Sequence, residues 1–186
     1  MVHLVNDMLD LATIESGTLQ LNIRDADLVQ IIRDSFSINR QIAEQKEISL
    51  SVKTENDSIP LKINGIKIRQ VADNPISNAI KFSYPGTAIN VRILRAGDYA
   101  EVSVCDQGQG ITAEELPKLF TPYSRVNVTS TAGEKSTGLG LAISDRIIQG
   151  HEGILSVESE VGKGSVFRFT LPVRPAHGEN TAQASS

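Results

Sequence analysis

Apolar residues at the start of the chain recur at three- and four-residue steps. This spacing over residues 2–14 predicts one face of a helix, and Ser16 and Gly17 end it. A helix of this length cannot bury its apolar stripe alone. It either docks on the body of the protein or forms the end of a longer helix that pairs with a partner, and we favour the second interpretation.

The spacing then changes several times between the helical and the strand period. The second predicted helix runs to about residue 45 and is capped by Asp25 or Asp27. It follows a short strand marked by the alternation of Leu19, Leu21 and Ile23. Its inward side chains are expected to be Leu28, Ile31, Ile32, Ile42 and Ala43. Next come a strand over residues 48–52, a polar turn containing proline, a helix over 66–82, and strands over 89–94 and 100–104 joined by a turn at 95–98.

Sustained periodicity is absent from residues 108–140, apart from a short helix predicted over 113–120. A connection of this length inside a compact domain is usually functional or mobile. A helix over 140–149, strands near 154–158 and 165–171 and a turn at 161–164 complete the pattern, and the tail 174–186 is expected to be disordered. Helices beside a mixed or mostly antiparallel sheet predict an α+β fold, a two-layer sandwich over residues 18–173.

Composition narrows the class of protein. The 186 residues are 40% hydrophobic and 22% charged, with a net charge of -4, as in an ordinary globular domain. Basic residues form no clustered stripe, which argues against nucleic-acid binding. The single cysteine, Cys105, excludes an internal disulfide and favours a cytoplasmic setting. No apolar run reaches the roughly 18 residues of a membrane span, so we expect no membrane contact by this segment.

One carboxylate stands where an apolar strand ends, in the run from Asp106 to Gly110. A carboxylate at the mouth of a sheet can accept a hydrogen bond from a ligand amine. Gly108 and Gly110 lack a β-carbon, so the backbone can take a positive φ or approach a flat ligand closely. A plain turn of Asp and Gly has the same composition, so this motif alone leaves both interpretations open.

Two further motifs carry polar groups suited to phosphates. Asn74, Asn78 and Lys81 fall on one face of the helix predicted over 66–82, where amide oxygens and an ammonium suit magnesium and the phosphates it bridges. A solvated helix face is the alternative. The second motif, residues 136–143, is a glycine-rich turn that enters a helix, whose free amides would form an anion site; a tight packing turn is the alternative.

Taken in order, five motifs resemble the successive boxes of the catalytic, ATP-binding domain of sensor histidine kinases. They are residues 74–82, 106–110, 119–125, 137–141 and 162–167, and the leader 9–17 is similar to the end of that family's dimerisation helix. The resemblance covers nearly all of the chain up to Pro172. It implies the GHKL ATPase (Bergerat) fold, with residues 1–17 as the helix end and junction and residues 109–137 as a lid over the nucleotide.

The resemblance also implies a role for each motif residue. Asp106 would accept from the exocyclic amine of adenine, Gly108 and Gly110 would shape the floor of the base pocket, and Phe82 would border the ring. Asn78 would hold Mg²⁺ with support from Asn74. The phosphates of ATP would be bound by Lys81, Arg125, Thr137, Gly138, Leu139, Gly140 and Leu141, with Asn78, Lys81 and Arg125 acting in catalysis.

Kinase activity is favoured over hydrolysis by Asn74, because hydrolysing relatives carry a Glu there that activates water, whereas Asn cannot take a proton at neutral pH. Asp73 is rotated about 100° away on the helix. The acceptor histidine motif of the family is missing, since neither His3, His151 nor His177 has that setting. We interpret His151 as structural.

The acceptor is therefore expected on a dimerisation domain of the same or another kinase. The chain would be a fragment of a homodimeric parent, or would act on a separate acceptor and, indirectly, on a response regulator; a membrane-anchored parent stays open. A degenerate nucleotide-binding regulatory module is the alternative. Two residues depart from the family pattern: Pro75 inside the helix, at a cost of about 3 kcal/mol if the helix is regular, and Ser136 in place of a usual Gly.

Overall fold

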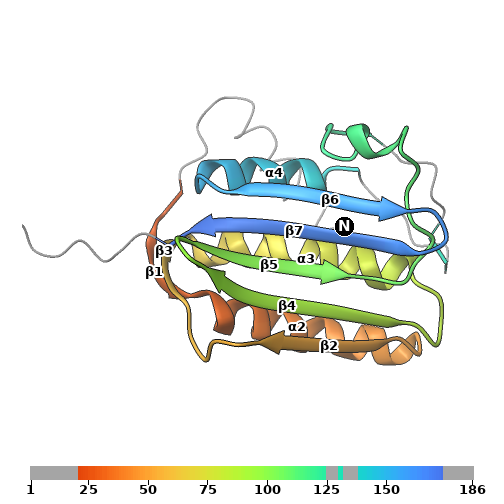
Figure 1. Cartoon of the computed structure of the whole chain (residues 1–186), viewed down its shortest axis with the longest axis horizontal. Helices are drawn as coiled ribbons and strands as arrows, with labels where there is room; N and C mark the ends of the chain where they lie inside the picture. Colours follow the sequence, from red (N-terminus) through yellow and green to blue (C-terminus); the bar gives the residue numbers. More distant parts are fainter. Residues whose placement is uncertain (1–20, 125–129, 132–137, 174–186) are drawn as a thin grey trace, which may run out of the picture.

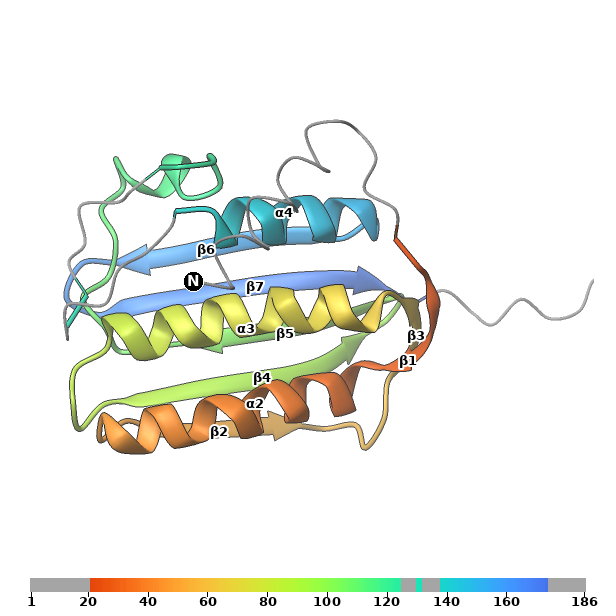
Figure 2. The same ribbon diagram turned by 180° about the vertical axis from the view of Figure 1, so that it is seen from behind.

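A computed structural model of the chain describes residues 21–124, 130–131 and 138–173. Its main feature is a five-stranded sheet whose single helical layer comprises α2, α3 and α4 (Figure 1). Seen from behind, the three helices lie side by side, with α3 between α2 and α4 (Figure 2). The predicted α+β two-layer sandwich is therefore confirmed.

The sheet is mixed, with the strand order β2-β4-β5-β7-β6. Only the pair β2 and β4 is parallel; the other neighbours are antiparallel. The strands span Ser49–Thr54 (β2), Ala88–Ala96 (β4), Tyr99–Cys105 (β5), Ile154–Glu160 (β6) and Gly164–Pro172 (β7). The turn between β4 and β5 contains Gly97 at φ 61°, which confirms the hairpin expected there.

Helix α3, Gly65–Phe82, occupies the centre of the helical layer and has more buried residues than α2 or α4. Its apolar face buries Ile68, Val71, Ile76 and Ile80 against the sheet. The helix continues unbroken past Pro75, whose own side chain is buried. Pro75 therefore neither delays the start of α3 nor ends it, and both asparagines of the predicted stripe lie on one helix.

Helix α2, Leu28–Gln45, begins where the sequence predicted, and the choice of cap is settled in favour of Asp27. Its Oδ1 accepts from the amide of Val29 at 3.0 Å and from that of Ile59 at 2.9 Å. The expectation that Ile42 faces inward is wrong, because this side chain is 52% exposed. Ala43, the next residue, takes the inward position, since one helical residue rotates the side chain by about 100°.

A separate two-stranded sheet, β1 paired with β3, differs from the predicted elements at two places. Strand β1 is Arg24–Asp27, whereas the described part of the expected strand, residues 21–23, is irregular. Its partner β3, Pro60–Ile63, lies where only a polar turn was expected. Pro60 stands at the first position of its strand, where a missing amide is tolerated.

The helix expected over residues 113–120 is also wrong in extent. Only the 3₁₀ turn Leu116–Lys118 forms there. Its second residue is Pro117, which has no amide to donate. The amides of Lys118 and Leu119 each bond to a carbonyl three residues back, as in a 3₁₀ turn. Helix α4, Gly140–Gly150, matches its prediction. Among the described residues, no helix has both the length and the apolar character needed to cross a bilayer.

Candidate active site

Asp106 lies directly after β5 and is almost completely buried. Its amide donates to the Ser165 carbonyl at 2.9 Å, and its Oδ1 accepts from the amides of Ser165 at 3.2 Å and Gly108 at 2.8 Å. One carboxylate oxygen is thus tied to the backbone of two segments. Within the described part of the chain, Oδ2 has no hydrogen-bond partner, which leaves it available to a ligand.

Burial raises the pKa of the Asp106 carboxyl above its usual 3.8, although the amides of Gly108 and Ser165 oppose the shift. The two causes have different physical origins: loss of water disfavours the charged form, while the donated hydrogen bonds favour it. A donor on a ligand would add to the second effect. Asp106 is therefore a buried acceptor whose ionisation a hydrogen-bond donor would stabilise.

The glycines of the motif are required by the protein's own backbone. A β-carbon at Gly108 would lie 2.7 Å from the carbonyl oxygen of Phe82, and one at Gly110, whose φ is 71°, would overlap the carbonyl of Glu160. The loop after β5 is thereby packed between the end of α3 and the turn before β7. This close packing places the backbone of Phe82 beside the Asp106 loop.

Asn78 and Asn74 differ in how their amides are engaged. Asn78 is half-buried and forms no side-chain hydrogen bond within the described residues. The Nδ2 of Asn74 donates to the Gly140 carbonyl at 2.9 Å and to Ser144 Oγ at 2.7 Å. The free amide oxygen of Asn78 fits a hard cation such as Mg²⁺, which binds oxygen ligands. Asn74 has only its Oδ1 left for such a role.

Lys81 lies on the same stripe of α3, with its Nζ 5.3 Å from the centre of the Phe82 ring. Asp73 points to the opposite side, where its Oδ1 accepts from Ser35 Oγ at 2.5 Å and Asn39 Nδ2 at 3.3 Å, both on α2. The prediction that Asp73 faces away from the stripe is confirmed. The stripe therefore carries two amides and one ammonium.

The glycine-rich turn enters α4 without a side-chain cap. The first amides of a helix have no partner within it. Gly138 has φ 71°, and a β-carbon there would lie 2.8 Å from the Ser124 carbonyl oxygen. The end of segment 119–124 is therefore packed against the turn that starts α4. Leu139 is buried, so it contributes its backbone and not its side chain to the surface.

Thr131 is a site residue that the motifs did not reveal. Its amide donates to the Lys81 carbonyl at 3.2 Å, and its Oγ1 lies 3.0 Å from that carbonyl and 2.9 Å from the carbonyl of Ser83. Lys46 Nζ reaches the same Lys81 carbonyl at 3.0 Å. These contacts cover the last carbonyls of α3, and no local sequence pattern announces them.

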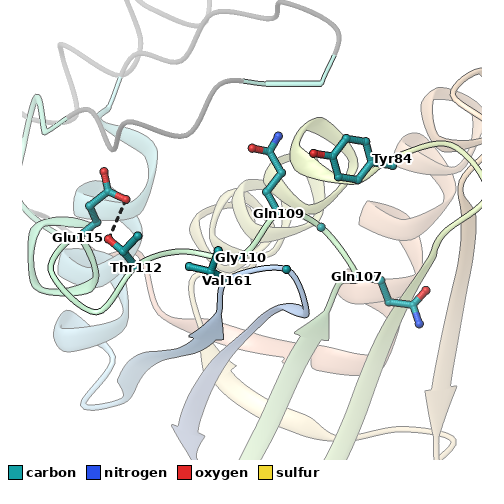
Figure 3. Close-up of a pocket in the computed structure, with 9 residues that line it drawn as sticks. Tyr84, Gln107, Gln109, Gly110, Thr112, Glu115 and Val161 are labelled. Carbon is teal, nitrogen blue, oxygen red and sulfur yellow. Dashed lines mark hydrogen bonds between the residues drawn. The ribbon is translucent and has the colours of Figure 1, made fainter.

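A cavity of about 420 Å³ adjoins the loop that follows Asp106 (Figure 3). Four of its lining residues, Gln107 to Gly110, belong to the loop, but Asp106, Asn78 and Lys81 do not line it. Its remaining lining residues are Tyr84, Thr112, Glu115, Val161 and Gly162. With one carboxylate and no Lys or Arg in its lining, this cavity does not suit a triphosphate.

His151, the C-cap of α4, is buried and joins two helices. Its Nε2 accepts from the Asn64 amide at 3.0 Å, so Nδ1 must carry the proton that it donates to the Ile147 carbonyl at 2.7 Å. Burial lowers the pKa of His151 below 6.5, against the opposing effect of the Ile147 carbonyl. This arrangement supports the structural role expected for His151.

The structure thus brings most of the predicted site together at one end of the molecule's helical layer. Asp106, Gly108, Gly110 and Phe82 adjoin one another, and Asn74 contacts the start of α4. Arg125, Thr137 and Ser136 lie outside the described residues, as do the leader, the tail and most of the far half of the predicted lid.

Comparison with known proteins identifies the class. The family model described as "Histidine kinase-, DNA gyrase B-, and HSP90-like ATPase" matches residues 63–175. The sensor histidine kinase RcsC of Escherichia coli K12 is 33% identical over 175 residues, which are 93% of this chain and 18% of RcsC. The chain spans about a fifth of the length of such curated relatives.

Solved structures of similar fold are also histidine kinases. The nucleotide-free catalytic domain of the histidine kinase ThkA superposes with a TM-score of 0.72 at 27% identity, covering 82% of this chain and 96% of that domain. Full-length ShkA in complex with AMPPNP gives a TM-score of 0.81 at 25% identity, covering 94% of this chain and 36% of ShkA. The chain belongs to the histidine kinase-, DNA gyrase B- and HSP90-like ATPase family, and its fold is that of a histidine kinase catalytic domain.

Proposed function

We propose that this domain transfers the γ-phosphate of magnesium-bound ATP to a histidine on a dimerisation domain of the same or another kinase. The observation that carries the proposal is Asp106, whose Oδ1 is fixed by two backbone amides while Oδ2 stays open to a ligand. The binding of AMPPNP in the ShkA complex supports the choice of an adenine nucleotide.

At the base end, the open oxygen of Asp106 accepts from the exocyclic amine of adenine. A hydrogen bond to an ionised carboxylate is stronger than one between neutral groups, and burial of Asp106 excludes competing water. Gly108 and Gly110 hold the loop close to Phe82, which borders the ring. This end sets the identity of the base and takes no part in the chemistry.

At the phosphate end, the amides that begin α4 bind the anionic chain, because a helix N-terminus offers both free donors and a favourable dipole. The backbone of Gly138 to Leu141 and the hydroxyl of Thr137 supply donors, and Lys81 neutralises charge. Asn78 would hold Mg²⁺, which screens the charges of the phosphate oxygens. Arg125 follows Ser124, which packs against Gly138, and this neighbour supports a role for Arg125 at the terminal phosphate.

These groups catalyse by position and charge, which is where phosphoryl transfer gains most of its acceleration. Asn74 stands where a water-activating base would be needed for hydrolysis, and its amide cannot take a proton at neutral pH. Asp73 is engaged with α2. We therefore propose a protein histidine as acceptor, with a response regulator receiving the phosphoryl group afterwards from a homodimeric parent kinase.

Titration of ATP into the protein with and without magnesium, followed by addition of a dimerisation domain bearing the acceptor histidine, tests the proposal. We expect ATP binding that magnesium strengthens and phosphate that appears on the added domain. A matched acceptor domain with its histidine replaced by Ala is the control for other phosphorylation sites. Binding without transfer would replace the kinase with a regulatory nucleotide-binding module, and absence of binding at millimolar ATP would exclude both.

A further inference from the structure

Asn74 connects two helices that meet at the phosphate end of the site. From α3 its Nδ2 reaches the Gly140 carbonyl at 2.9 Å and Ser144 Oγ at 2.7 Å, both in the first turn and a half of α4. Because a carbonyl oxygen only accepts, the nitrogen of the Asn74 amide must face it. The side chain is therefore held in one orientation by α4 itself.

The contact is close on both sides. A β-carbon at Gly140 would lie 3.0 Å from Asn74 Oδ1 and 3.2 Å from its Cγ, so a glycine at this position lets the amide rest on the helix backbone. Ser144 has no exposed surface, which removes its hydroxyl from any contact with an ion or a nucleotide. Ser144 can therefore affect the site only through the position of α4.

We propose that Asn74 is a positioning residue that sets the start of α4 against α3, through Gly140 and Ser144. The inference rests on the proposed function, since the amides so placed are those assigned to the phosphates. Asn78 lies about one turn further along α3. Asn74 thereby fixes the spacing between the anion-binding helix start and the predicted ion ligand, and this contribution needs no metal.

Nucleotide affinity measured in magnesium and again in EDTA distinguishes this role from ion binding. We expect Asn74→Ala and Ser144→Ala each to weaken ADP binding about fivefold, the equivalent of one net hydrogen bond, in both solutions. The double variant should bind no more weakly than Asn74→Ala alone, because Asn74→Ala already removes the contact with Ser144. Ser35→Ala is the matched control: it also removes a wholly buried serine bonded across helices, but between α2 and α3.

The control should lower stability and leave ADP affinity unchanged. A loss for Asn74→Ala in magnesium alone, or wild-type affinity for Ser144→Ala, would overturn the proposal. Hydrogen exchange in the nucleotide-free protein reads the position of α4 without any ligand. The Ile143 amide donates to the Leu139 carbonyl at 2.9 Å. It should exchange faster in Asn74→Ala and in Ser144→Ala than in Ser35→Ala. Equal exchange would refute the positioning role even if ATP did not bind at all.

Discussion

Replacing Asp106 by Asn and by Ala should separate the roles of its two carboxylate oxygens, one in anchoring the loop and the other in binding the nucleotide. In Asp106→Asn, the amide Oδ1 can still accept from Gly108 and Ser165, so the loop anchor survives. The nitrogen that replaces Oδ2 is a donor, and it faces the donor amine of adenine. Loss of a charge-assisted hydrogen bond of about 1.5–3 kcal/mol predicts roughly 10- to 100-fold weaker ATP binding.

The stability of Asp106→Asn should be unchanged or slightly increased at neutral pH. Burial raises the pKa of Asp106 in the folded protein, so the folded state holds its proton more readily than the unfolded state. The corresponding stability is present below the unfolded pKa and is lost as pH rises through the folded one. At neutral pH the buried charge is therefore a net cost, which the neutral amide removes.

Asp106→Ala provides the contrast. It leaves the buried amides of Gly108 and Ser165 without an acceptor, which should lower the free energy of unfolding by at least about 2 kcal/mol. Isothermal calorimetry with ADP and urea unfolding measure the two quantities. The reasoning is refuted if Asp106→Asn binds ADP like the wild type, or if it loses as much stability as Asp106→Ala.

Three further predictions concern other parts of the site. Because burial lowers the pKa of His151 in the folded protein below 6.5, the unfolded state takes up the proton first, and stability should fall as the pH drops below 6.5. In urea unfolding, His151→Gln should reduce this dependence of stability on pH. Thr131→Val should raise the KM for ATP about fivefold by releasing the end of α3, whereas Thr121→Val, an exposed threonine in the same connection, should match the wild type. Gly110→Ala should cost at least about 2 kcal/mol of stability, through its positive φ and overlap with the Glu160 carbonyl, and thermal unfolding would show the loss; an unchanged midpoint would contradict it.

Much of the fold was predictable because the information is local. Helices α2, α3 and α4 and the five strands of the main sheet follow the period of apolar residues, and a cap such as Asp27 acts within two residues of itself. The small sheet was missed for the converse reason. β1 and β3 are four residues each, and each is stabilised by pairing with the other, although α2 and β2 separate them in the sequence.

The motifs of the candidate site were likewise readable as residue types and spacings: a carboxylate between strand and glycines, amides one helical turn apart, a glycine-rich helix start. Their working geometry was not. That Asp106 uses one oxygen for the backbone and keeps one open depends on β7 supplying the Ser165 amide. The contact of Thr131 with Lys81 joins residues 50 positions apart in the chain.

The sequence by itself determined the three main helices, the strands of the main sheet, the family resemblance and the candidate residues of the motifs, since these depend on side-chain type and on repeats of two or 3.6 residues. Only the tertiary structure decided what each side chain contacts. Asn74 shows the difference: its spacing from Asn78 predicted an ion ligand, and the packing of α3 on α4 gave its amide nitrogen to Gly140 and Ser144. A hydrogen bond between residues far apart in the chain exists only once packing has brought both partners within about 3 Å.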